Sequence, residues 1–320
     1  STILHYLFAN YLAFYLSQSD RQVNPPLYLT YSQKLLDVSK TNIKSILRLN
    51  SSRLQRLSWN DHAEKGFDEI RDICFGEFHV FLRKLISEEQ ASNFVPDNRM
   101  DFPRFRREYL EIRWRKRELT RLDPETAWHV IRGYIKGMSD SGGGYFDPVD
   151  YKQFDSKRKT VTQETFDLVF EHVWEGWYKE FCREGRYWDN QDLTRAILDS
   201  GQEISKYPVV FCDEAQDFTP NELELILRLS LFSNRKLQPF QLKQVPFAFA
   251  GDPFQTLNPT GFDWEKMKST FHEKIVQELD RTDKSGLEFN YQELRFNYRS
   301  SKDIAGVCNL IQLVRGLIFN

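Results

Sequence analysis

The sequence predicts an α/β protein in which helices flank a parallel β-sheet and a large, mostly helical segment is inserted. Three short apolar runs that end in polar or small residues are typical of buried parallel strands, and they span residues 27–30, 209–212 and 245–250. Helical patterns separate these runs. Because ligand sites form at the carboxyl ends of parallel strands, the residues that follow each run are the first place to look for function.

Three helices are predicted next to these strands. The apolar segment 3–16 is interrupted by His5 and Asn10 and lacks a basic start, so we expect a helix packed in a core rather than a membrane span or a signal peptide. Residues 219–222 read Thr-Pro-Asn-Glu, a capping box with proline at the first helical position. Residues 300–303 similarly combine a serine cap with an acid in the first turn.

The long interval from residue 51 to residue 191 is helix-like and rich in aromatic residues. Spacings of three and four predict that one set of rings forms a packed helix face rather than a stacking platform; the set is Trp174, Trp177, Tyr178 and Phe181. Residues 139–144 contain three consecutive glycines and predict a flexible loop.

The composition is that of a soluble globular protein with one to three domains. The chain has 320 residues, of which 40% are hydrophobic and 28% charged, and its formal net charge is −2. The four cysteines show no zinc-binding spacing, which indicates a reducing compartment such as the cytoplasm or, in a eukaryote, the nucleus.

The strongest chemical signal is the acidic pair that ends the second apolar run. Asp213 and Glu214 follow Val209-Val210-Phe211-Cys212 directly. Mg²⁺ prefers carboxylate and water oxygens, so one acid can hold the ion while its neighbour orients an attacking water. Asp213 is therefore predicted as the metal ligand and Glu214 as the base. The alternative is a buried strand followed by a solvated acidic loop.

Two later segments carry residues suited to a nucleotide. The third apolar run ends in Gly-Asp-Pro-Phe-Gln, whose Gln255 is suited to hydrogen-bonding a phosphate or the attacking water. Tyr298 and Arg299 precede the predicted helix start at Ser300. Tyrosine offers a flat face for a base, and arginine offers a fork of donors for phosphate oxygens.

Taken in order, the segments DEAQD (213–217), GDPFQ (251–255) and NYRS (297–300) resemble motifs II, III and IV of superfamily 1 helicases of the UvrD/Rep/PcrA group. Residues 27–32 are similar to motif Ia of that family, and residues 189–193 to its D-x-x-D-L element. The resemblance implies that Asp213 binds Mg²⁺, Glu214 activates water, Gln255 senses the γ-phosphate, Tyr298 stacks on adenine and Arg299 reaches the γ-phosphate. It also implies that Thr30, Tyr31 and Ser32 meet single-stranded DNA.

The same resemblance implies a P-loop NTPase fold with a RecA-like sheet. Residues 1–50 would be the first part of domain 1A, residues 51–191 a helical 1B-like insertion, residues 192–292 the second part of domain 1A, and residues 293–320 motif IV and the start of domain 2A. The implied activity is that of an ATP-dependent 3′–5′ DNA helicase or translocase. ATP, Mg²⁺ and single-stranded DNA or RNA are the implied ligands.

The sequence also departs from that family. It holds no G-x-x-x-x-G-K-[ST] loop. Its first residues resemble the helix that follows a Walker A lysine. By that resemblance, Ser1 or Thr2 would coordinate Mg²⁺. The motifs after IV are missing too, so we expect an internal fragment that does not hydrolyse ATP alone. The arginine that usually follows motif III is absent, and Phe262 or Trp264 would either stack on a base or form a hydrophobic plug.

A basic segment from residue 104 to residue 121 is the second candidate for nucleic-acid contact. It holds eight basic and three acidic residues, a surplus of five. Arg113, Arg117 and Arg121 recur every four residues and would share one helix face, either tracking phosphates or facing solvent. Two other functions remain open: a nucleotide-gated regulatory or scaffold module without unwinding activity, and a helicase-derived half that pairs with a nuclease or defence partner.

Overall fold

The computed structural model describes residues 2–18, 24–49, 60–113, 119–120, 122–138, 144–156, 159–233, 247–252 and 264–276, and positions 304, 306, 307, 310 and 313. These residues form an α/β protein that is mostly helical and contains a four-stranded parallel sheet. The strands are β1 (Leu27–Thr30), β2 (Phe75–Glu77), β3 (Val210–Cys212) and β4 (Phe247–Phe249).

The strand order β2-β1-β3-β4 places β1 and β3 in the middle of the described sheet. Tyr28 lies opposite Phe75 on one side and Phe211 on the other, and Phe211 lies opposite Ala248. Because all pairings are parallel, the carboxyl ends of the four strands share one edge of the sheet. The three predicted strands are confirmed, and the described part of the third runs from Phe247 to Phe249. β2 was not predicted, because it lies directly between two helices without intervening turn residues.

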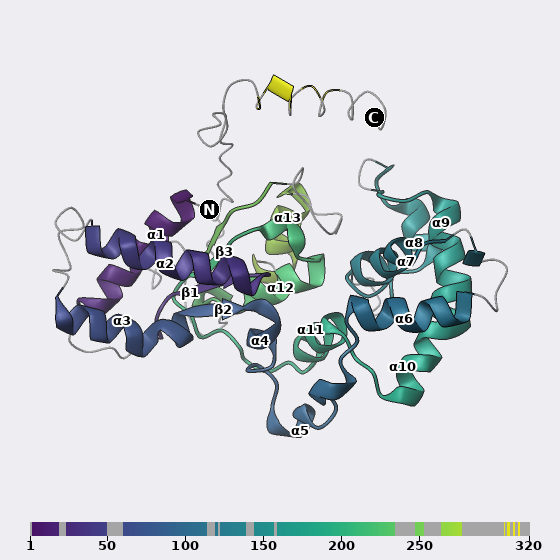
Figure 1. Cartoon of the computed structure of the whole chain (residues 1–320), viewed down its shortest axis with the longest axis horizontal. Helices are drawn as coiled ribbons and strands as arrows, with labels where there is room; N and C mark the ends of the chain where they lie inside the picture. Colours follow the sequence, from purple (N-terminus) through teal and green to yellow (C-terminus); the bar gives the residue numbers. More distant parts are fainter. Residues whose placement is uncertain are drawn as a thin grey trace.

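One face of the sheet is covered by helices α1 (Thr2–Leu16), α2 (Gln33–Leu49) and α3 (Asp61–Cys74). These helices lie at the left of Figure 1. Leu12 of α1, together with the aromatic rings of Tyr28 and Phe211, belongs to the hydrophobic cluster under these helices. The prediction of a core-packed first helix is thus confirmed. Within the described part of the chain, no helix has the length and apolar character needed to cross a membrane.

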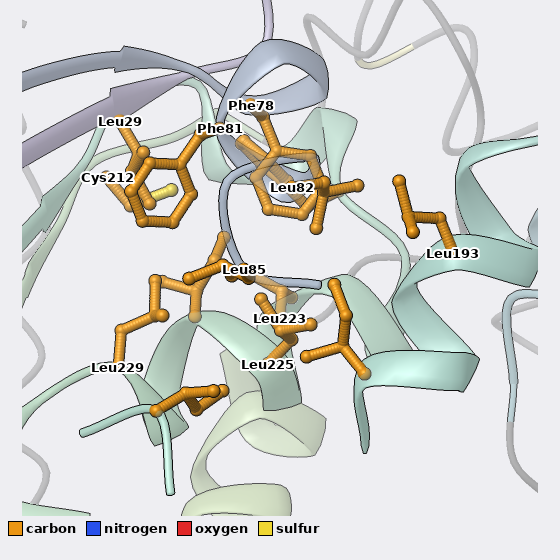
Figure 2. Packing of buried hydrophobic residues seen from close by; sticks show 14 of the residues in the cluster. Leu29, Phe78, Phe81, Leu82, Leu85, Leu193, Cys212, Leu223, Leu225 and Leu229 are labelled. Atoms are coloured by element: carbon orange, nitrogen blue, oxygen red, sulfur yellow. The ribbon is translucent and has the colours of Figure 1, made fainter. Parts of the chain in front are cut away.

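The opposite face is covered by α4 (Phe78–Leu82), α11 (Asn190–Asp199) and α12 (Pro220–Arg228). Figure 2 shows Leu29 and Cys212 of the neighbouring strands facing the side chains that these helices contribute. Leu29 and Tyr28 point to opposite faces, which explains why the strands read as continuous apolar runs. Helix α12 begins with the predicted capping box, in which Thr219 and Glu222 bond reciprocally.

A helical lobe lies beside the sheet, at the right of Figure 1. It comprises α6 (Phe102–Arg113), α7 (Pro124–Val130), the π-helix η3 (Ile131–Ile135), α8 (Pro148–Gln153), α9 (Gln163–Leu168), the π-helix η5 (Val169–Tyr178) and α10 (Lys179–Gly185). Its own hydrophobic cluster buries Trp174 and Tyr178, with Trp177 and Phe181 partly buried against it, so the packed helix face is confirmed. Ring pairs such as Tyr151 and Phe166, stacked with centroids 4.1 Å apart, fill this cluster.

Short helical elements complete the described chain. They are α5 (Glu88–Ala91), η1 (Pro96–Asn98), η6 (Ala215–Asp217), η7 (Leu231–Ser233), α13 (Trp264–Thr270) and the π-helix η10 (Phe271–Val276). The most important of these for function is η6, because it begins directly after Glu214, the second residue of the predicted acidic pair.

Candidate functional site

The acidic pair lies where the predicted parallel sheet places it, at the carboxyl end of the central strand β3. The backbone nitrogen of Asp213 donates to the carbonyl oxygen of Leu29, which continues the ladder to β1 by one residue (3.0 Å). The Asp213 carboxylate is buried and accepts hydrogen bonds from the Tyr28 hydroxyl (2.9 Å) and from the Glu214 backbone nitrogen (3.1 Å). Burial and the neighbouring Asp213 raise the pKa of Tyr28 far above its ordinary value, so its hydroxyl keeps the proton that it donates.

Glu214 has a left-handed backbone conformation, with φ 55° and ψ 46°. Residues with a Cβ rarely adopt this conformation, which costs on the order of 1–3 kcal/mol, and such residues cluster at functional sites. The conformation turns the chain sharply between strand β3 and helix η6. As a consequence, Glu214 is only half-buried, while its neighbour Asp213 points into the protein.

Gln216 links the acidic pair to the end of strand β4. Its amide nitrogen donates to Oε2 of Glu214 (2.7 Å), and its amide oxygen accepts from the backbone nitrogen of Asp252 (3.0 Å). A backbone bond from Ala215 to Ala250 (2.8 Å) runs beside this bridge. A Cβ atom at Gly251 would lie 2.6 Å from the Gln216 side-chain oxygen and 3.1 Å from the Ala215 backbone nitrogen, so glycine allows this close approach. These bonds therefore link the Glu214 carboxylate to the backbone of Gly251 and Asp252.

A second polar cluster joins the helical lobe to the sheet. Arg132 of η3 is buried, and its guanidinium donates to the Tyr31 hydroxyl (2.7 Å), to the Asp217 carbonyl oxygen (3.3 Å) and to the Glu222 carboxylate (3.3 Å). Glu222 also accepts from the Gln191 amide (2.7 Å). Burial raises the pKa of this fully buried carboxyl group, although the charge of Arg132 and the hydrogen bonds from Thr219 and Gln191 oppose that shift.

Lys136, four residues after Arg132, makes a second connection between the helical lobe and the sheet. Its ammonium group is buried and contacts Asp189 (2.6 Å) and Asp192, the two acids of the D-x-x-D-L element. Burial opposes the charge of Lys136, but both acids raise its pKa above the ordinary value. Asp189 and Asp192 also form the capping box that starts helix α11. These acids therefore anchor the lobe to the sheet and contribute to its structure.

A pocket of about 390 Å³ opens between the lobe and the sheet. Its lining combines rings, cations and acids from several elements: Tyr31, His79, Arg99, Met100, Asp101, Phe102, Glu125, Trp128, His129, Arg132, Asp189, Asn190 and Gln191. Burial lowers the pKa of His79 to about 3 and that of His129 to about 4, with help from Arg132, so both rings are neutral at pH 7. The Nε atom of Arg99 is buried and has no hydrogen-bond partner among the described residues. The pocket thus offers aromatic surface next to guanidinium groups.

The predicted nucleic-acid residues occupy different environments. Tyr31 lines the pocket, but its hydroxyl is bonded to Arg132 and its ring packs edge-on against His79 and Phe218. Ser32 is half-buried beside it. Thr30 is fully buried within β1.

Three further predicted residues are described. Trp264 begins α13 and is partly buried against the sheet core, which favours the plug over the stacking platform. Arg113 is the last residue of α6, and its guanidinium donates to the carbonyl oxygens of Leu119 (3.2 Å) and Thr120 rather than standing free on a helix face. Thr2 is exposed at the start of α1. The remaining predicted site residues lie outside the described residues: Ser1, Arg117, Arg121, Gln255, Phe262, Tyr298 and Arg299.

Sequence reasoning missed Tyr28, Gln216 and Arg132. Tyr28 was predicted only as part of an apolar strand and of the segment similar to motif Ia, and Gln216 only as part of the segment DEAQD. Arg132 forms hydrogen bonds with Tyr31 and Glu222, which lie 101 and 90 positions away in the sequence. Such distant partners cannot be predicted from a local sequence pattern. Comparison of the sequence with models of known protein families gives no match, and a search of curated proteins finds no matching relative.

Proposed function

We propose that this chain forms part of the ATPase core of a UvrD-type 3′–5′ helicase or translocase that acts on single-stranded nucleic acid. The observation that carries the proposal is the acidic pair at the end of the central parallel strand, bridged by Gln216 to the backbone of Asp252 after the neighbouring strand. The RecA-like fold, the P-loop and the division into domains 1A, 1B and 2A are parts of this proposal. They rest on the resemblance described above.

Asp213 and Glu214 have the chemistry that a magnesium site needs. Asp213 supplies a hard oxygen donor, and an ionised carboxylate has about four lone-pair positions, so an oxygen that accepts one hydrogen bond can also bind a cation. Magnesium, when bound, would neutralise charge on the phosphates. Glu214, held in place by Gln216, would take the proton of the attacking water. Ser1, Thr2, Gln255, Tyr298 and Arg299 keep the nucleotide-binding and catalytic roles predicted from the sequence.

Magnesium-dependent nucleotide binding tests this assignment in the complete protein that carries the sequence. Asp213→Asn keeps the size of the side chain and an acceptor for Tyr28 but removes the charge. We expect the Mg²⁺ affinity of the nucleotide complex to fall by more than about tenfold, since even outer-shell partners of a metal ligand typically contribute 10–100-fold. Fluorescent ADP titrated with and without Mg²⁺ measures this. Unchanged Mg²⁺ dependence would refute the assignment of Asp213.

The pocket between the lobe and the sheet supports the nucleic-acid part of the proposal. Aromatic rings stack on bases, and guanidinium groups attract phosphates, in proteins that bind single strands without sequence preference. Trp128 and Phe102 contribute rings to the pocket, and Arg99 contributes a cation. Because Tyr31 is tied to Arg132, we expect Trp128 to be the stronger stacking surface.

Trp128→Ala is therefore expected to weaken binding of single-stranded DNA by about 1–3 kcal/mol, the usual effect of removing one stacking ring, without changing the salt dependence. Trp177→Ala is the matched control: both rings are half-buried and pack near Phe105, with centroid distances of 5.0 and 6.0 Å, but only Trp128 lines the pocket. Fluorescence anisotropy with a labelled oligonucleotide measures both variants.

The Tyr31 hydroxyl already accepts a hydrogen bond from Arg132, which favours the second candidate, a nucleotide-gated module that does not unwind nucleic acid. Under that candidate, Trp128→Ala and Trp177→Ala would have equally small effects on binding of single strands. The Mg²⁺ dependence of nucleotide binding would still respond to Asp213→Asn. The comparison of Trp128→Ala with Trp177→Ala therefore separates the two functions.

A further inference from the structure

The carboxylate of Asp213 is held by a side chain from the neighbouring strand. The Tyr28 hydroxyl of β1 donates to Oδ2 of Asp213 at 2.9 Å, and Tyr28 is fully buried. Its ring is enclosed by Phe8 and Phe75, with centroids 5.2 and 5.9 Å away, and by His5 at 5.8 Å. This packing leaves the hydroxyl little freedom to turn to another acceptor, so its bond to Asp213 is fixed by the core.

A line of polar groups continues from Tyr28 to the first helix. The Ser39 hydroxyl donates to the Tyr28 oxygen at 3.5 Å, the longest and weakest contact of the line, and His5 Nε2 lies 3.0 Å from the Ser39 oxygen. A phenol has one proton, so when Ser39 donates to its oxygen that proton is left for Asp213. Ser39 then accepts from His5, which requires the tautomer with the proton on Nε2. All three bonds run in one direction, from α1 to the acid.

We propose that Tyr28 is a positioning residue for Asp213, orienting its carboxylate toward the divalent cation of the nucleotide site, with Ser39 and His5 behind it. This inference rests on the proposed function, because it takes Asp213 as the metal ligand. Groups that hydrogen-bond a metal ligand orient it and tune its basicity, and their loss typically costs 10–100-fold in metal affinity or activity. The position of Tyr28, buried and in the adjacent strand of a rigid sheet, suits that role.

Tyr28→Phe tests the role, because it removes the hydroxyl and keeps the ring. We expect the affinity for Mn²⁺ in the presence of ADP, measured from the free Mn²⁺ signal in electron paramagnetic resonance, to fall by about 10–100-fold. The affinity for ADP without a divalent cation should stay unchanged. Tyr109→Phe is the matched control, since Tyr109 is also fully buried and donates one hydrogen bond, to the Leu122 carbonyl oxygen (3.2 Å), within the helical lobe.

Asp213→Asn serves as the reference that separates the two claims. If Asp213→Asn leaves Mn²⁺ affinity unchanged, the proposed function and this inference both fall. If it lowers the affinity while Tyr28→Phe behaves like Tyr109→Phe, only the positioning role is overturned. Should Tyr28→Phe not fold, Ser39→Ala takes its place, because it keeps the Tyr28 hydroxyl but removes the group that directs it. A severalfold loss of Mn²⁺ affinity is then expected, and no loss overturns the inference.

Discussion

Glu214→Gln is expected to lower ATP turnover in the complete protein by about 10²- to 10⁴-fold while nucleotide binding stays intact. Glutamine has the same shape and can still accept the hydrogen bond from Gln216, so the left-handed turn at residue 214 is preserved. The amide cannot take a proton from the attacking water. The loss should therefore appear in turnover and not in ADP affinity, which steady-state kinetics and a nucleotide titration measure separately.

Glu224→Gln is the control for this substitution. Glu224 is a buried glutamate of α12 that pairs with Arg228 on the same helix (2.9 Å) and plays no part in the proposed chemistry. Its replacement should leave turnover within a factor of a few. Equal and mild effects of the two substitutions would favour the solvated acidic loop over a catalytic base at Glu214.

The second large effect concerns the attachment of the helical lobe. Arg132→Met is expected to lower the free energy of unfolding by about 3–5 kcal/mol, because it leaves the Glu222 carboxylate buried without its cation. Arg228→Met should cost less than about 1 kcal/mol, since the Arg228–Glu224 pair is more exposed and lies within one helix. Urea unfolding of the two variants gives this comparison.

A double variant separates the buried charge from lost packing. Arg132→Met combined with Glu222→Gln removes both charges, while the glutamine keeps an acceptor for the backbone nitrogen of Thr219 that Glu222 caps (2.8 Å). We expect the double variant to recover most of the stability lost in Arg132→Met, because removing both members of a buried pair is often nearly neutral. A double variant as unstable as the single one would show that Arg132 acts through packing alone.

The fold could be predicted where the signal was local. Continuous apolar runs indicated strands buried on both faces, and the capping box at Thr219 located the start of α12. β2 was missed because its three residues, Phe75 to Glu77, follow α3 and precede α4 without a turn. The π-helical segments η3 and η5 were also missed, since their sequences have no pattern that distinguishes them from α-helix.

The site could be predicted only in part, for a related reason. Asp213 and Glu214 stand out because two acids end an apolar strand, and the parallel sheet then fixes where they lie. The groups that hold them do not stand out, because their partners are distant in the sequence: Tyr28 bonds Asp213 across 185 positions, and the amide of Gln216 reaches the backbone of Asp252 across 36. Arg113 shows the converse, since regular spacing suggested a free basic face while its guanidinium is bonded to nearby carbonyl oxygens.

The most direct test of the central claim is the rate of Mg²⁺-dependent ATP hydrolysis by the complete protein, measured with and without single-stranded DNA. The proposed function predicts hydrolysis that requires Mg²⁺, rises when single strands are added and is lost in Glu214→Gln. Hydrolysis that is insensitive to single strands and to Glu214→Gln, or an absence of hydrolysis in the complete protein, would contradict the assignment of the acidic pair as the centre of a nucleic-acid-driven ATPase.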